Sequence, residues 1–371
     1  MLFIVPNNPK TNKTMGTVTE TYDFIVGIDT HAKKHVFTIL NSIGELVGRG
    51  ECRVLPKDFT RFHLLIRKKT DSEGQNRTRI LFVIEGTSGY GETLTKFLMG
   101  QGEDVCEYKP HGRAKSRRAG SGKNDQLDSE NIARDALHLP IAKLICPRTG
   151  DSRKMLRIAL SSRSNITKQQ VMDRLTLIAL VRSIDIGVDA RRPLSLTAIR
   201  NIAGVRARSA DAPHEAVARA ESKRLAASVM EKEQLKIENA RTLSRAVESL
   251  APGMTDLIGV GPVTAAQIIC SYSHKGRIKS PEAFAMIAGV APIPASSGNT
   301  MRHRLNKFGD RALNAAINMI VLNRMRIDEP TKTYMNKRTA QGKSKKEIKR
   351  ALKRYVARDM FKFLETCEIG D

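Results

Sequence analysis

Four carboxylates within the first 128 residues have the types and positions expected of a metal site. Asp29 lies near the end of one apolar run, Glu85 closes another, and Asp125 and Asp128 lie three residues apart where a helical pattern begins. Continuous apolar runs predict strands buried on both faces, where an isolated carboxylate is costly unless a cation compensates it. Carboxylates that converge also repel one another. The pattern therefore predicts a site for a divalent metal.

The elements that would position these acids follow the order of a mixed α/β domain. Apolar runs predict strands, amphipathic spacing predicts helices, and Ser42-Ile43-Gly44 has the composition of a hairpin turn. The expected elements are strands at 23–30, 35–41 and 45–54, a helix at 57–69, a strand ending at residue 85, a helix carrying Leu94, Phe97 and Leu98, a strand at 104–108 and a helix at 126–137. This is the order of an RNase H-like fold.

Asp125 and Asp128 admit a second interpretation. Their spacing places them on one face of the predicted helix. Carboxylates in the first turn of any helix are also stabilised by the helix dipole. Taken alone, the pair therefore does not distinguish metal ligands from ordinary charges at a helix start.

The charge of the chain predicts a polyanionic partner, for which nucleic acid is the natural choice. The 371 residues include 63 Lys and Arg against 38 Asp and Glu, a formal net charge of +25. Aromatic residues are few and Trp is absent, so phosphate contacts rather than base stacking should supply the affinity. A basic stretch before Asp125 is either a nucleic-acid contact or a solvated loop. Its candidate contacts are Arg113, Lys115, Arg117, Arg118 and Lys123.

The sequence predicts a cytoplasmic, nucleoid-associated protein without a membrane span. The five cysteines are scattered and have no zinc-ligand spacing, which favours a reducing compartment. The opening run Met1–Val5 is too short for a signal peptide and is followed by Pro6. No apolar stretch reaches transmembrane length.

Composition shifts predict four segments along the chain. These are a flexible tail at 1–22, an α/β catalytic domain at 23–150, a helical linker or arm at 151–250 and a mainly α C-terminal domain at 251–371. The arm would pair helices at 152–183 and 215–250 in a coiled-coil-like manner, with irregular chain at 184–213. Ala251-Pro252-Gly253 breaks the pattern and opens the last segment.

Two glycines near the start of the C-terminal segment suggest a helix-hairpin-helix turn. Gly259 and Gly261 flank Val260 and precede Pro262, between apolar helical patterns. Such a turn presents backbone N–H groups, and the following helix N-terminus, to a phosphate. A purely structural turn remains the alternative.

A serine pair in the same segment is the candidate nucleophile. Ser296 and Ser297 precede three cationic residues, Arg302, Arg304 and Lys307. Ser-Ser-Gly is ordinary turn chemistry. Beside cations, a serine could instead attack a phosphodiester, because positive charge stabilises both the alkoxide and the pentavalent phosphorus.

These features together resemble the DEDD transposases of the insertion sequence 110 family. The N-terminal resemblance lies in Ile28–His31, Ile84–Tyr90 and Lys123–Ser129. In the C-terminal segment the Gly259–Pro262 turn, Ala288–Pro292, Ser296-Ser297-Gly298 and the basic residues after them are also similar. The resemblance covers nearly all of residues 23–327. Asn124 and Ser129 stand where the family has Thr and Ala, and Phe308 replaces an Arg.

The resemblance implies a recombinase with a RuvC-like catalytic domain and a serine nucleophile in the C-terminal domain. Asp29, Glu85, Asp125 and Asp128 would hold Mg²⁺, as one ion or two, and Ser297 would attack DNA, with Ser296 as the second candidate. It also implies a structured guide RNA and assembly as a homodimer or homotetramer. No Walker-type loop is present, so no nucleotide cofactor is expected.

Two other functions stay open on sequence grounds. The chain could be a metal-only nuclease of the Holliday-junction-resolvase type, in which the two serines form only a turn. It could also be a non-catalytic nucleic-acid-binding protein derived from a mobile element.

Overall fold

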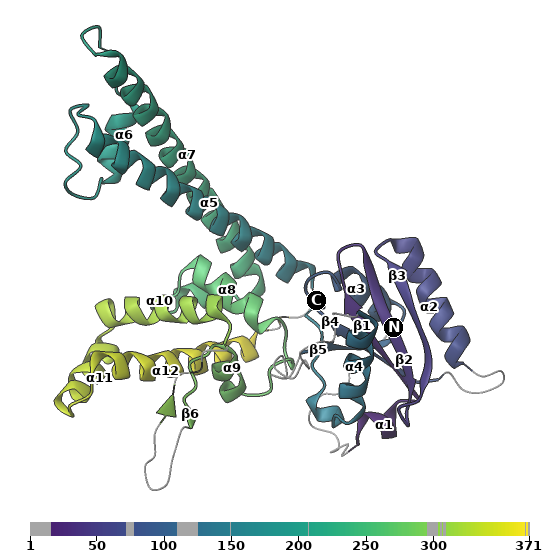
Figure 1. Ribbon diagram of the computed structural model, residues 1–371. Helices are drawn as coiled ribbons and strands as arrows, with labels where there is room; N and C mark the ends of the chain where they lie inside the picture. The colour runs from purple at the N-terminus through teal and green to yellow at the C-terminus, as the bar shows by residue number, and fades with distance from the viewer. Residues whose placement is uncertain are drawn as a thin grey trace. The chain divides into compact units, whose positions relative to one another are not determined.

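The computed structural model contains two compact units, Met1–Thr149 and Gly150–Asp371 (Figure 1). It describes residues 16–71, 78–109, 125–148, 150–206, 208–294, 303–304, 306, 309–367 and 369. The first unit is a mixed α/β domain and the second is mostly helical. The prediction of an α/β domain followed by a mostly helical region is confirmed.

The first unit is built on one five-stranded sheet with the order β3-β2-β1-β4-β5. The antiparallel half contains β1 (Phe24–Thr30), β2 (Lys34–Asn41) and β3 (Leu46–Arg53). β4 (Ile80–Glu85) and β5 (Asp104–Tyr108) continue the sheet parallel to β1. The arrangement is consistent with the expected RuvC-like domain.

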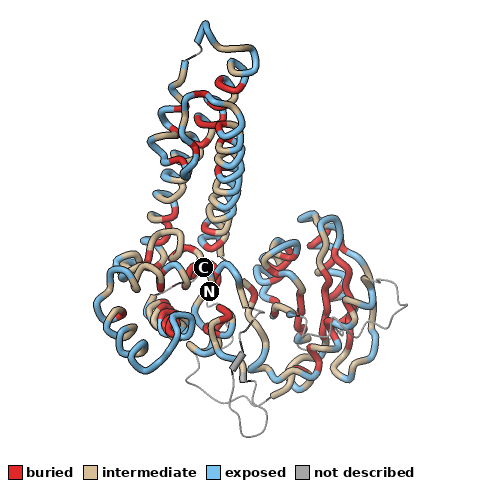
Figure 2. The backbone as a smooth tube through the Cα atoms, turned by 60° about the vertical axis from the view of Figure 1, so that its left-hand side comes forward, coloured by how far each residue is buried: buried red, intermediate tan, exposed pale blue. Residues whose placement is uncertain are grey.

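Helices cover both faces of this sheet, so its central strands are buried on both sides (Figure 2). α2 (Pro56–Thr70) and α3 (Glu92–Gly100) pack on one face, against side chains such as Ile28 and Ile84. α4 (Asp125–Leu137) packs on the other face, against Ile25, Leu81 and Val83, near the short elements α1 (Val18–Thr21) and η1 (Ile141–Lys143). Side chains alternate between the two faces along each strand, and this alternation decides which residues can reach α4.

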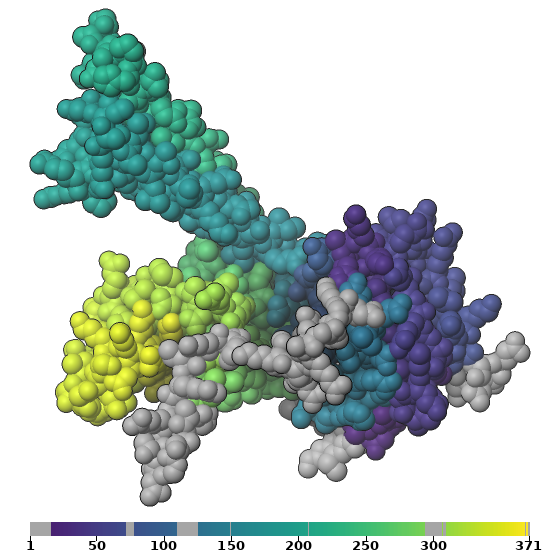
Figure 3. Space-filling view, in the orientation of Figure 1, coloured from purple at the N-terminus to yellow at the C-terminus, as the bar shows by residue number. Residues whose placement is uncertain are grey.

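The second unit carries an arm of two long helices (Figure 3). α5 (Asp151–Ser183) and α7 (Pro213–Leu250) run side by side, and side chains of each helix donate to backbone carbonyls of the other. Gln170 Nε2 donates to Val229 O at 3.2 Å, and Asn239 Nδ2 donates to Ala159 O at 2.9 Å. Because polar groups buried between helices need such partners, these bonds fix the register of the arm.

The sequence predicted irregular chain at 184–213, but the structure contains a helix within this segment. It contains α6 (Leu196–Ala203), which packs on α7 and buries Ile199 and Ile202. Ser195 begins the helix, because its side-chain oxygen accepts the Ala198 N–H at 3.1 Å. The apolar residues of α6 join a cluster shared with α5 and α7.

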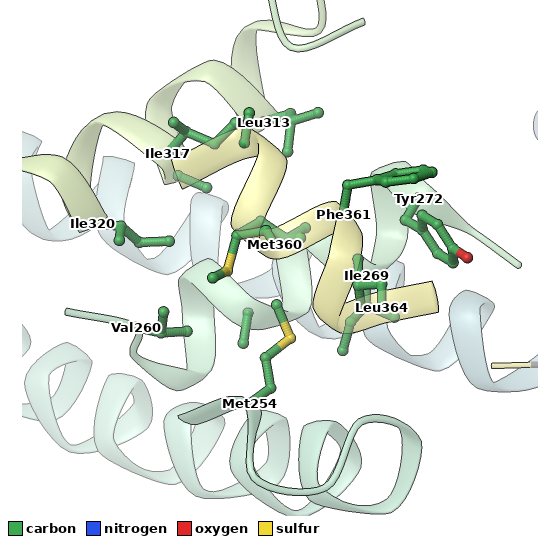
Figure 4. Packing of buried hydrophobic residues seen from close by; sticks show 14 of the residues in the cluster. Met254, Val260, Ile269, Tyr272, Leu313, Ile317, Ile320, Met360, Phe361 and Leu364 are labelled. Atoms are coloured by element: carbon green, nitrogen blue, oxygen red, sulfur yellow. The ribbon is translucent and has the colours of Figure 1, made fainter. Parts of the chain in front are cut away.

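The remaining helices form one apolar core (Figure 4). They are η2 (Met254–Asp256), α8 (Pro262–Tyr272), α9 (Pro281–Ile287), α10 (Arg311–Ile327), α11 (Glu329–Ala340) and α12 (Lys345–Thr366). Ile269, Ile317, Met360 and Leu364 are among the fully buried members of this core. A small ribbon of β6 (Ile293–Pro294) and β7 (His303–Arg304) lies between α9 and α10 in the chain.

None of the helices in the described part of the chain is both long and apolar enough to cross a bilayer.

Candidate functional site

The sheet brings two of the predicted carboxylates to one edge. β1 and β4 are parallel neighbours, and their last paired residues are Ile28 and Ile84. Both isoleucines pack on the α2–α3 face. Asp29 and Glu85, which come next, therefore point to the opposite face, the one that α4 covers. Adjacent parallel strands thus end with two acids directed to the same side of the sheet.

Asp29 lies close to a second acid, Asp125, and to a histidine, His31. This histidine was not among the ligands predicted from the sequence. Donor atoms of Asp29, His31 and Asp125 all lie within 4.8 Å of one another. His31 Nε2 is 3.1 Å from Asp29 Oδ2 and 3.6 Å from Asp125 Oδ2. The Asp29 side chain is 11% exposed, whereas those of His31 and Asp125 are 31% and 38% exposed. One side of the cluster is therefore anchored in the sheet and the other is open to a ligand.

The Nε2 atom of His31 is placed where it could act as a metal ligand. Nε2 is buried and makes no hydrogen bond of acceptable geometry within the described part of the chain, although Asp29 is close. A buried nitrogen without such a bond is costly unless an ion or water supplies a partner. Two carboxylates and one imidazole form a donor set that suits a divalent cation. The residues present therefore fit a metal ion.

A second histidine supports the backbone of His31. The His31 N–H donates to His35 Nδ1 at 3.4 Å. His35 is almost completely buried, and burial together with the nearby His31 lowers the pKa of His35 to about 4. The neutral ring can therefore act as the acceptor that this hydrogen bond requires.

Close packing between α4 and the sheet holds Asp125 near Asp29. Gly27 lies under α4: a Cβ atom at this position would come 2.6 Å from the Ala133 backbone nitrogen and also contact the Ser129 carbonyl oxygen. Next to this contact, the buried hydroxyls of Thr38 and Ser129 are hydrogen-bonded at 2.8 Å. The serine that departs from the family pattern thus has its own partner on β2. Both features fix the helix that begins at Asp125.

Glu85 and Asp128 lie near this cluster in the fold but are not part of it. Among the described side chains, the group with donor atoms within 4.8 Å contains Asp29, His31 and Asp125 and neither of these two acids. The Glu85 carbonyl accepts the Thr30 hydroxyl at 2.7 Å, which ties the ends of β1 and β4 together. Asp128 lies one turn further along α4. The four-acid metal site therefore stays a prediction.

His31 could have been selected from the sequence. It follows Asp29 by two residues at the end of a predicted strand, so the two side chains lie on the same side of the chain. In the segment Ile28–His31, only the aspartate was predicted to be a ligand.

The Gly259–Gly261 turn has a clear packing role. Gly259 has φ +83°, and a Cβ atom there would lie 3.0 Å from Ile320 O on α10. The Gly259 carbonyl accepts from Asn323 Nδ2 at 3.3 Å, and the Gly261 N–H donates to Thr264 Oγ1 at 3.0 Å. At position 259, glycine is thus required by both the backbone conformation and the neighbouring helix. A phosphate contact at this turn stays a prediction.

Most of the other predicted site residues lie outside the described part of the chain. Arg304 lies in β7, where the backbone alone is described. The residues outside the description are Arg113, Lys115, Arg117, Arg118, Lys123, Ser296, Ser297, Arg302 and Lys307.

Replacing His31 with glutamine tests whether the cluster binds metal. We expect Mn²⁺ affinity to fall by about tenfold or more, because imidazole is a good ligand for transition metals and even the loss of residues behind the ligands costs about 10- to 100-fold. Mg²⁺, which prefers oxygen ligands, should be affected less. Mn²⁺ titration followed by electron paramagnetic resonance would measure the change.

The matched control is His138→Gln, at an exposed histidine that follows α4. The control should bind Mn²⁺ as the unaltered protein does. Equal Mn²⁺ affinities for all three proteins would show that His31 is not a metal ligand, and the donor set of Asp29, His31 and Asp125 would be rejected.

Comparison with known families finds two matching models. A DEDD-type model described as "Transposase" matches residues 26–185, and a model described as "Transposase IS116/IS110/IS902 family" matches residues 254–336. The first match contains Asp29, His31 and Asp125, and the second contains the Gly259–Gly261 turn and the serine pair. None of the curated proteins compared with the chain matches it.

Proposed function

Because this chain belongs to the IS110 family of transposases, we propose that it cleaves and rejoins DNA strands with a metal site in its first unit and a serine in its second. A transposase of a mobile element recombines DNA, so DNA is the substrate. The observation that carries the chemical proposal is the convergence of Asp29, His31 and Asp125 at the edge of the sheet.

The metal proposed for this site is Mg²⁺, bound as one ion or two. Asp29 and Asp125 would provide its carboxylates, with His31 beside them and with Glu85 and Asp128 available from the neighbouring strand and the next helical turn. When bound, such an ion neutralises charge on a phosphate oxygen and orients the strand. The chain's contribution is to hold the carboxylates of Asp29 and Asp125 close enough to share that ion.

The proposed nucleophile is Ser297, with Ser296 as the second candidate. Attack by Oγ forms a serine–phosphate ester while one P–O bond of the DNA strand breaks; the hydroxyl loses its proton and the departing oxygen gains one. The number of phosphate ester bonds is unchanged, so strands can be exchanged without a nucleotide cofactor. Arg302, Arg304 and Lys307 would stabilise the charge that develops on the phosphate.

Nucleic-acid binding is proposed for the basic stretch before α4 and for the Gly259–Gly261 turn. The basic residues Arg113, Lys115, Arg117, Arg118 and Lys123 would contact phosphates and thereby make binding depend strongly on salt. At the turn, the start of α8 provides N–H groups that have no acceptor within the helix. This is the support for a helix-hairpin-helix contact with the DNA backbone.

We also propose a structured guide RNA and a homodimer or homotetramer as the active assembly. The family resemblance implies both, and the net charge of +25 is large enough for two polyanionic partners. The proposed division of labour is a tail at 1–22, a catalytic domain at 23–150, an arm at 151–250 and a serine-bearing domain at 251–371.

Replacing Ser297 with alanine is the decisive test of this function. We expect it to abolish strand exchange and the covalent protein–DNA adduct, because the methyl group has no oxygen to attack phosphorus. DNA binding should be unchanged, since one hydroxyl contributes little beside many phosphate contacts. The measurement is a denaturing gel of labelled DNA incubated with Mg²⁺ and protein, followed by mass spectrometry of the adduct.

Ser296→Ala is the matched control and should retain the adduct. If the two variants exchange roles, Ser296 is the nucleophile. If the unaltered protein and Ser297→Ala both cut DNA without forming an adduct, the protein is instead a metal-only nuclease of the Holliday-junction-resolvase type.

A further inference from the structure

A groove of about 870 Å³ lies in the second unit, between the segment after α9, the helix α10 and the helix α12. Its described lining residues come from 288–292, from Asn306 and Gly309, from α10 and from α12. No function assigned above uses this groove.

Positive charge dominates the described lining of the groove. None of the described residues that line it is acidic, and none of its six cations forms an ion pair with a described carboxylate. Five of these cations come from one helix face, since they recur every three or four residues along α12. The six are Arg311, Lys346, Lys349, Arg350, Lys353 and Arg354.

Lys353 shows that the cations of the groove lie close enough together to affect one another. Its ammonium group donates to Asn314 Oδ1 at 3.1 Å, and Asn314 in turn donates to the Ala288 carbonyl at 2.8 Å. Burial, and then the nearby Lys349, lower the pKa of Lys353. An anion placed between these two lysines would relieve both effects, because it would return a partner to a partly desolvated cation.

The floor of the groove is made of small residues. Gly289 and Gly309 are in backbone contact, and a Cβ atom on Gly309 would lie 2.5 Å from the Gly289 Cα. Alanines continue the floor, and none of the described lining residues is aromatic. The two glycines let the segments that line the groove pack closely on each other, and the bases of a bound nucleic acid would find no ring in the described lining on which to stack.

The spacing of the cations matches a chain of phosphates better than a single anion. Lys346 and Arg354 are separated by eight residues, which is about 12 Å along a helix, and one strand of a duplex carries about three or four phosphates over that length. One small anion would engage only part of such a row. Among the described lining residues none is acidic or aromatic, which points to recognition of the backbone rather than of the bases.

We propose that this groove binds the sugar–phosphate backbone of one DNA strand, over about three or four phosphates. Pro292 and Asn306, which flank the ribbon of β6 and β7, both line the groove. The choice of DNA as the ligand rests on the proposed function, whereas the presence of a phosphate-binding groove does not.

The test neutralises three groove cations on α12 and compares them with three nearby cations outside the groove, one on α11, one in the turn before α12 and one on α12. The groove variant is Lys346→Gln, Lys349→Gln and Arg350→Gln. The control variant is Lys337→Gln, Lys343→Gln and Lys362→Gln, at exposed residues that do not line the groove. Both variants lose the same net charge, and glutamine is compatible with a helix.

Binding is measured by fluorescence anisotropy with labelled DNA duplex, single-stranded DNA and RNA of equal length, over a range of salt concentrations. The protein carries Ser297→Ala and the buffer holds no divalent metal, so failure of the proposed chemistry leaves this measurement intact. We expect the groove variant to bind DNA about a hundredfold more weakly at 0.1 M salt, and its plot of log affinity against log salt to be shallower by about two to three units. The control variant should change by less than about threefold.

Equal losses in the two triple variants would overturn the proposal, because they would show that net charge alone matters. A groove variant that loses RNA binding but keeps DNA binding would overturn the choice of DNA. If the triple variant does not fold, as judged by circular dichroism, Arg350→Gln alone should make the salt plot shallower by about 0.9; an unchanged slope would count against the groove.

Discussion

Replacing Asp125 with asparagine is expected to reduce metal-dependent DNA cleavage by about a thousandfold, the scale seen when one group that stabilises transition-state charge is removed. The substitution keeps the size and hydrogen-bonding shape of the side chain but removes its negative charge. Asp125 is 38% exposed and lies 3.6 Å from His31, so its carboxylate faces the open side of the cluster. Asparagine is also well tolerated near a helix start. The fold should therefore survive while metal affinity and cleavage are lost.

The matched variants come from the same helix. Asp135→Asn should leave cleavage unchanged, because Asp135 accepts the Tyr108 hydroxyl at 2.7 Å and an amide oxygen can replace it. Asp128→Asn separates two versions of the site: loss of cleavage supports the four-acid prediction, and retained cleavage restricts the site to the cluster of Asp29, His31 and Asp125. The measurement is single-turnover cleavage of labelled DNA in Mg²⁺, with Mn²⁺ binding measured in parallel.

If Asp125→Asn cleaves DNA at the rate of the unaltered protein, the metal assignment is wrong. Mn²⁺ binding distinguishes the reasons. Unchanged binding would place the metal elsewhere, whereas lost binding with normal cleavage would show that the ion is not needed for the reaction.

Sequence reasoning could find those site residues whose charge is unfavourable in the apolar strands that carry them. A single acid inside a buried apolar strand is unfavourable on its own, which is why Asp29 and Glu85 were informative. The structure places them at the ends of neighbouring strands, as β1 pairs with β4. His31 lacks such a conflict, because histidine at a strand end is common and needs no special explanation. Its role became visible once its ring nitrogen was found near two carboxylates.

α6 and α11 are helices that lay beyond sequence reasoning, for different physical reasons. α6 follows a proline and is short, so its apolar pattern was too brief to distinguish from a loop. α11 has no continuous apolar stripe: Thr331 is its buried residue, and Tyr334 and Met335 pack only partly against the core. A helix without an apolar stripe gives no periodic signal. Its start is fixed by Asp328, whose side chain accepts the Thr331 N–H at 3.1 Å.

Contacts between elements are the part that a pattern along the chain cannot supply. The row of cations on α12 can be read from the sequence, but the floor of Gly289 and Gly309 that turns this row into one wall of a groove depends on tertiary packing. Gly27 is a similar case: a glycine inside an apolar strand indicates a close approach of some kind. The sequence does not say that α4 makes that approach.

Gly27→Ala should destabilise the first unit and weaken metal binding at the same time. The new Cβ atom would lie 2.6 Å from the Ala133 nitrogen and 2.9 Å from the Ala133 Cβ. These obstacles belong to the body of α4 rather than to the end of a flexible side chain, so the helix itself must move. Overpacking of this kind costs about 1–3 kcal/mol. Removing a glycine from the unfolded chain returns only about 0.4–1 kcal/mol, so we expect a net loss of stability.

Movement of α4 would also carry Asp125 away from Asp29 and strain the hydrogen bond between Thr38 and Ser129. Mn²⁺ affinity should therefore fall in protein that is still folded, by more than the change in unfolding free energy alone would predict. Thermal unfolding and Mn²⁺ titration below the transition measure the two effects separately. Gly100→Ala, where a Cβ atom has no neighbour within 4 Å, is the matched control and should alter neither. Lower stability with unchanged metal affinity would show that the cluster does not depend on the position of α4.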